Sequence, residues 1–254
     1  MRILLTLCLL LLLTLNAGAE TLTIRADNWP PFNGEPKDAK SGYMIEVLRE
    51  IYGPLGHKID YQLLSWDDSL ASVRKGQFNA VVGAARDDAV DFIFPQESFG
   101  KSSNTFFVLG KSSWVYGGIA SLAKVKLGVI EDYAYSDELD DYIKANKKGS
   151  KVLVSRGEEA LALLINKLQT GKVDVVVEDA SVMLYSLMEL GLPPWQIKAA
   201  GAPQDSQDIY IAFAPGIPAS KKYAQQFDEG IRKLRASGKL QQILARYNLS
   251  DWKK

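Results

Sequence analysis

Two side chains of opposite charge, Arg86 and Asp179, each follow a short apolar run. Arg86 comes after the run 79–83 and two alanines, and such a run predicts a buried strand. Ligands of α/β proteins bind beside the carboxyl ends of strands, and a guanidinium holds a carboxylate through two parallel hydrogen bonds. Arg86 is therefore a candidate for binding a carboxylate. The alternative is a surface arginine paired with nearby acids, Asp87, Asp88 or Asp91.

Asp179 lies between a predicted strand, 173–177, and a predicted helix, 180–190. An aspartate in this position is a good helix N-cap, because its carboxylate accepts hydrogen bonds from the first backbone N–H groups. It can also face a ligand, and the two roles are compatible. Glu178 is the neighbouring candidate for the same function.

Three aromatic residues fall in or beside predicted loops. Trp29 and Phe32 flank Pro30 and Pro31, and Trp66 stands between a predicted strand and the helix that begins near Asp67. An aromatic wall can bind apolar stems or cations. We expect all three at a binding site, with ordinary core packing as the alternative for Phe32.

The residue counts exclude several kinds of chemistry. The 254 residues include one His and one Cys, so a Cys₄ or two-His zinc site and a disulfide framework are impossible within one chain. No Ser–His or Cys–His pairing offers a nucleophile, and we expect no cofactor and no catalysis. The formal net charge of +0 gives no electrostatic basis for nucleic-acid binding.

The N-terminus has the layout of a secretory signal peptide. Met1 and Arg2 precede the apolar run 3–15, and small residues at 16–19 end in an Ala-x-Ala pattern. The run is shorter than the roughly 20 residues that span a bilayer, which disfavours a membrane anchor. We expect cleavage after Ala19, followed by a soluble, periplasmic chain without cysteine.

Predicted strands and helices alternate in two separate blocks. The first block has strands at 21–25, 58–64 and 79–83, with helices at 43–52 and 67–75. After an irregular stretch, 95–113, the second has strands at 125–130, 151–155 and 173–177, with helices at 136–145, 158–170 and 180–190. A strand at 208–214 and two helical segments end the chain. Strands separated by helices predict parallel sheets, and therefore two α/β lobes.

Five motifs in this order resemble the family 3 solute-binding proteins, the periplasmic receptors of polar amino-acid ABC transporters. The resemblance covers essentially the whole mature chain, although Met44 stands where an acid is usual. The motifs are Gly42-Tyr-Met-Ile-Glu-Val, Arg86-x₃-Val90-Asp91-Phe92-x₂-Pro95, Leu127-Gly-Val-Ile, Lys172-Val-Asp-Val-Val-Val-Glu-Asp179 and Gly238-Lys-Leu-x-x-Ile-x-x-Arg-Tyr247.

The resemblance implies a periplasmic binding protein-like fold, in which two α/β lobes are joined by a two-strand hinge around a ligand cleft. It places lobe 1 at 20–103 and 204–254, and lobe 2 at 104–203, after a signal peptide at 1–19. It also implies a monomer that closes on a small molecule and docks on an ABC transporter permease. In this family pattern Arg86 binds the ligand carboxylate, and Asp179 accepts hydrogen bonds from the ligand amino group. The aromatic residues cover the ligand side chain.

Two loops depart from the family pattern. Before Arg86, only Gly83, Ala84 and Ala85 remain of a longer loop that carries Ser or Thr hydroxyls. In lobe 2, small hydroxyl residues are replaced by Asp132-Tyr133-Ala134-Tyr135. We expect Gly83, Ala84, Tyr133 and Tyr135 to line the pocket and to reshape it. The ligand can therefore be an amino acid or another small polar, aromatic or cationic molecule.

Three functions are compatible with these residues. The first is a receptor that delivers a solute to a permease. The second is a periplasmic lyase resembling cyclohexadienyl dehydratase, with carboxylates as its acid and base. The third is a binder that presents its ligand to a membrane partner for sensing. We expect the first, because nothing in the spacing requires catalysis.

Overall fold

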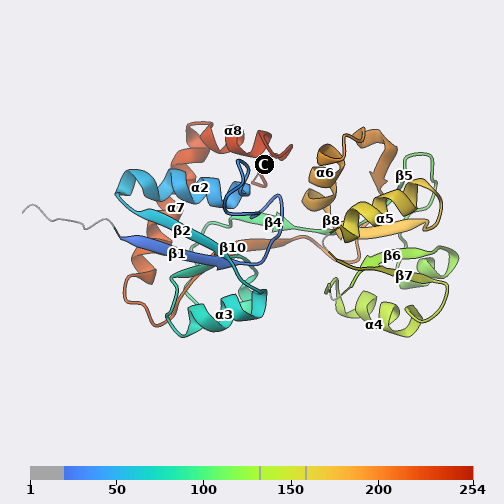
Figure 1. Ribbon diagram of the computed structural model, residues 1–254, viewed down its shortest axis with the longest axis horizontal. Helices are drawn as coiled ribbons and strands as arrows, with labels where there is room; N and C mark the ends of the chain where they lie inside the picture. The colour runs from blue at the N-terminus through green and yellow to red at the C-terminus, as the bar shows by residue number, and fades with distance from the viewer. Residues whose placement is uncertain (1–19, 132, 158, 254) are drawn as a thin grey trace, which may run out of the picture.

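The computed structural model describes residues 20–131, 133–157 and 159–253. Figure 1 shows two lobes side by side, joined by extended segments. The predicted signal peptide lies outside the described residues. Within those residues, no helix is long and apolar enough to cross a membrane.

The first lobe is built on a five-stranded sheet in the order β2-β1-β3-β10-β4. Strands β1 (Thr21–Ala26), β2 (Lys58–Leu63) and β3 (Ala80–Ala84) are parallel, as the alternation with helices predicts. Strand β10 (Gln207–Phe213) is antiparallel to β3 and to β4 (Gly100–Ser102). The chain therefore returns to this sheet near its C-terminus.

Alternate residues of these strands face two different cores. Ile24, Val82 and Ile211 pack with α2 (Tyr43–Tyr52), α7 (Ser220–Ala236) and α8 (Lys239–Ala245), whereas Val81 and Ala212 pack with α3 (Trp66–Arg74). This is the period of two that a strand imposes on its side chains. Helices thus cover both faces of the sheet (Figure 1).

The second lobe repeats this layering on a sheet in the order β7-β6-β8-β5-β9. Strands β6 (Leu127–Ile130), β7 (Val152–Ser155) and β8 (Val175–Asp179) are parallel. Strand β5 (Asn104–Leu109) runs antiparallel to β8 and to β9 (Ile197–Ala199). The helices are α4 (Asp137–Asn146), α5 (Ala160–Gln169) and α6 (Ala180–Glu189). The two mixed sheets agree with the two predicted α/β lobes.

The prediction of an irregular stretch at 95–113 is wrong, because β4 and β5 both lie within it. Only Ser103 separates a strand of the first sheet from a strand of the second. The chain crosses between the sheets a second time between β9 and β10. Strand β4 has 3 residues and no apolar run, so the local sequence gave no signal for it. Strand β5 contains the apolar run 106–109, which the prediction passed over, and its partners are remote in sequence.

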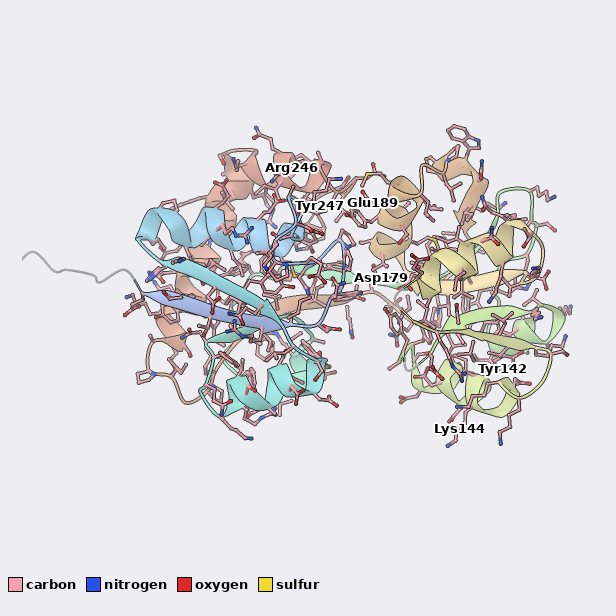
Figure 2. The ribbon with its side chains drawn as sticks, viewed as in Figure 1. Tyr142, Lys144, Asp179, Glu189, Arg246 and Tyr247 are labelled. Carbon is pink, nitrogen blue, oxygen red and sulfur yellow. The ribbon has the colours of Figure 1, made fainter. Side chains whose placement is uncertain are left out.

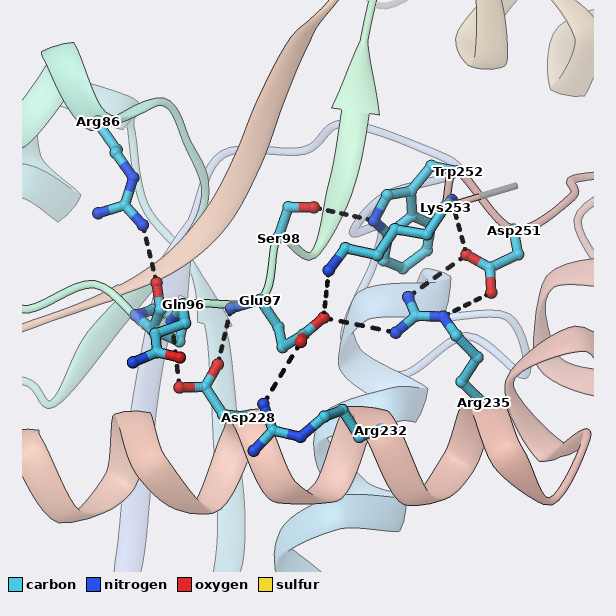
Figure 3. Close-up of polar contacts among 11 residues, drawn as sticks. Arg86, Gln96, Glu97, Ser98, Asp228, Arg232, Arg235, Asp251, Trp252 and Lys253 are labelled. Carbon is cyan, nitrogen blue, oxygen red and sulfur yellow. Dashed lines mark hydrogen bonds and ion pairs between the residues drawn. The ribbon is translucent and has the colours of Figure 1, made fainter.

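Ion pairs hold the segment before β4 and the C-terminal tail on α7 (Figure 3). Asp228 accepts hydrogen bonds from the backbone N–H groups of Gln96 and Glu97, and Glu97 pairs with Lys253 at 2.6 Å. Arg235 of α7 pairs with Asp251 at 2.7 Å. These contacts fix the first crossing strand to the C-terminal helices of lobe 1.

Candidate ligand-binding site

The carboxyl ends of strands from both sheets meet at a cavity of about 870 Å³. Asp27 follows β1, Gly83 lies near the end of β3, and Glu178 and Asp179 end β8. Ser102 and Asn104, on either side of the first crossing, also line the cavity. A second cavity of about 1090 Å³ adjoins it and shares Asp27, Trp29, Tyr133 and Glu178. The region between the lobes is thus one broad cleft.

Trp29 lies in the loop after β1 and lines both cavities. Its ring packs against Phe32 at a tilt of 31°, with a centroid separation of 4.1 Å, and a Cβ at Gly83 would stand 3.4 Å from two of its ring carbons. Gly83 has a φ of 89°, which favours glycine. Glycine at this position therefore allows the indole ring to lie against β3.

The other predicted aromatic residues divide between the cavity and the core. Trp66, the first residue of α3, lines the cavity, and so do Tyr133 and Tyr135. Phe32 is 1% exposed and packs among core residues that include Tyr43. Ala84 is also buried, because its side chain faces the core opposite to Gly83, whereas Ala85 lines the cavity.

Arg86 is not among the described residues that line either cavity. Its Nη2 donates a hydrogen bond to the carbonyl oxygen of Pro95 at 2.9 Å (Figure 3). The guanidinium lies over the rings of Tyr210 and Phe94, 4.4 Å and 5.2 Å from their centroids. The structure therefore gives Arg86 local partners and does not bring it together with Asp179. Among the described residues no ion pair joins Arg86 to Asp87, Asp88 or Asp91, and Asp91 pairs with Arg74 instead.

The carboxylate of Asp179 has a hydrogen-bond partner at every acceptor position. Its Oδ1 accepts from the backbone N–H groups of Ser181 and Val182, as an N-cap of α6, and its Oδ2 accepts from Ser103 N and Ser102 Oγ. A carboxylate offers about four such positions. Asp179, which lies between the lobes in Figure 2, thus joins α6 to the crossing strand.

Glu178 differs from its neighbour in having an unpaired oxygen. Its Oε1 accepts a hydrogen bond from Asp179 N at 2.7 Å, whereas Oε2 is buried and has no hydrogen-bond partner. The side chain is 1% exposed and lines both cavities. The pKa of Glu178 is raised to about 8. Burial is the main cause, and the charge of the nearby Asp179 contributes to the same shift.

Acidic groups surround the cavity on both sides. Burial raises the pKa of Asp27, and Asp88 and Asp140 show shifts in the same direction for the same reason. Asp88 accepts from Ala85 N and Asp140 from Tyr135 N, so both carboxylates also hold local backbone. Burial raises the pKa of Tyr133 to about 12, with contributions from Glu178 and Asp27. The tyrosines are therefore neutral hydrogen-bonding groups at physiological pH.

Comparison with known sequences decides the family. The profile of the bacterial extracellular solute-binding proteins, family 3, matches residues 22–250. The chain belongs to this family. The solute-binding protein is 26% identical to the L-cystine-binding protein TcyA of Bacillus subtilis over 221 residues, covering 85% of this chain and 76% of that protein. It is 20% identical to the probable amino-acid-binding protein YxeM of the same species, covering 87% and 81% of the two chains.

Solved structures share the fold of this solute-binding protein. An ancestral cationic amino acid solute-binding protein, AncCDT-1, superposes with a TM-score of 0.67 at 16% identity, covering 89% of this chain and 95% of that one. A histidine kinase sensor domain with similarity to periplasmic binding proteins superposes with a TM-score of 0.62 at 19% identity, covering 89% and 95%. The relatives named from sequence are binding proteins, and family members are extracellular.

Sequence reasoning missed Asp27 and left Glu178 as an alternative to Asp179. Asp27 comes directly after β1, at the same edge of the sheet as Gly83. The predicted strand at 21–25 ends shortly before Asp27, and this was the signal that could have found it. The unpaired Oε2 of Glu178 was not available from sequence, because it depends on which oxygen the Asp179 N–H contacts.

Proposed function

We propose that this solute-binding protein captures a small, amino-bearing polar solute between its lobes and delivers it to an ABC transporter permease. The cavity between the two sheets carries this proposal. Its lining comes from both lobes and includes Ser102 and Asn104, on either side of the first crossing. A solute bound there contacts both lobes at once, so binding favours a closed arrangement about the crossing strands.

Within this proposal, the walls that contact the solute are formed by aromatic residues, namely Trp29, Trp66, Tyr133 and Tyr135. Asp179 and Gly83 position the site, and Glu178 supplies an acceptor. Phe32 and Ala84 support the site from the core, whereas Arg86 lies outside the lining of both cavities, against the rings of Tyr210 and Phe94. Capture of amino compounds is supported by the amino-acid-binding relatives TcyA and YxeM. We further propose periplasmic export by a signal peptide at 1–19, and a monomer in solution.

A thermal-shift screen of residues 20–254 tests solute capture. The ligands are amino acids, amines, small carboxylates and prephenate. A ligand at a hundredfold excess over its Kd stabilises the folded protein by about 2.7 kcal/mol, which gives a clear shift. Recovery of the ligand unchanged supports a receptor, whereas its conversion to product contradicts this function and supports a lyase. Loss of solute uptake after gene deletion tests delivery to a permease.

A further inference from the structure

Apart from its tyrosines, the titratable side chains described in the cavity lining are all acidic. Asp27 and Asp88 contribute carboxyl groups from lobe 1, and Asp140 and Glu178 contribute them from lobe 2. Among the described residues that line the 870 Å³ cavity there is no lysine and no arginine. In the adjoining cavity Arg156 is present, but it pairs with Glu131 at 2.6 Å. The cleft therefore favours a cation and disfavours an anion.

Glu178, once ionised, adds an acceptor that the protein does not use. Its Oε2 is buried, has no hydrogen-bond partner and belongs to a side chain that lines both cavities. A buried acceptor without a donor destabilises the protein unless a ligand supplies that donor. Asp179 does not compete for the same donor, because its two oxygens already accept four hydrogen bonds.

Among the described residues that line the 870 Å³ cavity, no cationic side chain is available to pair with a ligand carboxylate. Arg86 lies outside the cavity lining, with its Nη2 bonded to Pro95. The helix N-termini beside the cavity already carry acids in their caps or first turns: Asp67 and Asp68 at α3, Asp137, Glu138 and Asp140 at α4, and Asp179 at α6. These carboxylates occupy the positive ends of the helices and repel a second anion.

We infer that the preferred ligand is an amine or guanidinium cation that carries no free carboxylate, with Glu178 Oε2 accepting a hydrogen bond from its charged nitrogen. The inference rests on the proposed function, in that the cleft must be the solute site. Trp29, Trp66 and Tyr133 line the same cleft and offer ring faces to the cation or to its apolar stem.

Five amines and their parent amino acids test the inference, because each pair differs by one carboxylate. The pairs are cadaverine and lysine, putrescine and ornithine, agmatine and arginine, histamine and histidine, and tyramine and tyrosine. Isothermal titration calorimetry on unmodified residues 20–254 measures Kd for all ten. We expect the tightest ligand to be an amine that binds at least tenfold more tightly than its parent. An amino acid that binds as tightly as its amine overturns the inference and leaves the proposed function standing. Binding of neither set overturns both.

Substitution of Glu178 tests its role as the acceptor. In Glu178→Gln we expect the Kd of the tightest amine to rise at least tenfold. Glu229→Gln, an exposed acid on α7, is the matched control and should change Kd by less than twofold. Unchanged amine affinity in a folded Glu178→Gln protein overturns this assignment. If that variant fails to fold, the paired titrations on the unmodified protein decide the ligand class alone.

Discussion

Glu178 and Asp179 are joined by a hydrogen bond of 2.7 Å from the Asp179 backbone N–H to Glu178 Oε1, yet their carboxylates are used differently. Asp179 is fully bonded to α6 and to the crossing strand, whereas Glu178 keeps one buried oxygen unpaired. Adjacent residues on a strand face opposite sides, which separates the two environments. This difference supports the proposal that Asp179 positions the site and that Glu178 binds the ligand.

Asp179→Ala should destabilise the protein by roughly 2–4 kcal/mol, because it removes an N-cap and the charged hydrogen bonds to Ser102 and Ser103. Urea unfolding of this variant and of the control Asp141→Ala, an exposed acid on α4, measures the difference. Asp179→Asn should recover part of the loss, since one amide oxygen can still cap α6. Equal stability of Asp179→Ala and the unmodified protein would show that these bonds do not join the lobes.

The raised pKa of Glu178 predicts a pH-dependent stability in the absence of ligand. The folded protein retains this proton up to a pH near 8, whereas the unfolded chain releases it near the usual value of 4.5. Between these values the folded state binds more protons, so the contribution of Glu178 to stability falls as pH rises, by roughly 1 kcal/mol per pH unit. Relative to Glu178→Gln, the unmodified protein should lose stability from pH 5 to pH 8. A pH-independent difference between the two proteins would be inconsistent with a protonated Glu178.

The same carboxyl should make amine binding stronger at higher pH. A cation pairs with the ionised form of Glu178, which becomes populated as pH approaches 8. The other titratable groups around this side chain in the cleft are Asp27, Asp179, Tyr133 and Tyr135. The two tyrosines stay neutral over this pH range. Kd for the tightest amine should fall up to tenfold per unit between pH 6 and pH 8. Calorimetry at three pH values measures this, and affinity that weakens with rising pH would contradict it.

Gly83→Ala should destabilise the protein by about 1–2 kcal/mol and change the surroundings of the Trp29 ring. The positive φ disfavours an L side chain, and the new Cβ would stand in van der Waals contact with two ring carbons. Gly117→Ala is the control, because a Cβ there meets no atom within 4 Å. Urea unfolding and tryptophan fluorescence report the two effects. Unchanged stability and emission in Gly83→Ala would mean that this glycine does not position Trp29.

Trp29→Ala should weaken the tightest ligand by about 5- to 30-fold, as expected for a partly desolvated cation–π contact. Trp195→Ala is the control. It removes the same kind of side chain from a position that is 76% exposed and that lines neither cavity of the cleft. Its ligand affinity should be that of the unmodified protein. Similar losses in both variants would place the ligand elsewhere.

The sequence predicted most elements of both lobes, because each buried strand and amphipathic helix has its own local period. It missed β4 and β9, which have 3 residues each, and β5, whose partners lie far along the chain. At the site, the positions of Trp29, Trp66 and Gly83 followed from strand ends and loops. The partners of Arg86 could not be predicted from the sequence. Its guanidinium lies over Tyr210 and Phe94, and Tyr210 comes beside it only because β10 pairs with β3 in the sheet.

The most direct test of capture by cleft closure is a distance between the lobes. Residues 20–254 contain no cysteine, so single cysteines at Lys75, after α3, and Lys147, after α4, can carry spin labels without background. Pulsed electron resonance with and without the tightest ligand from the titrations measures their separation. We predict a shorter and narrower distance distribution when the ligand is bound. A distribution that stays the same at saturating ligand would contradict binding by closure of the two lobes.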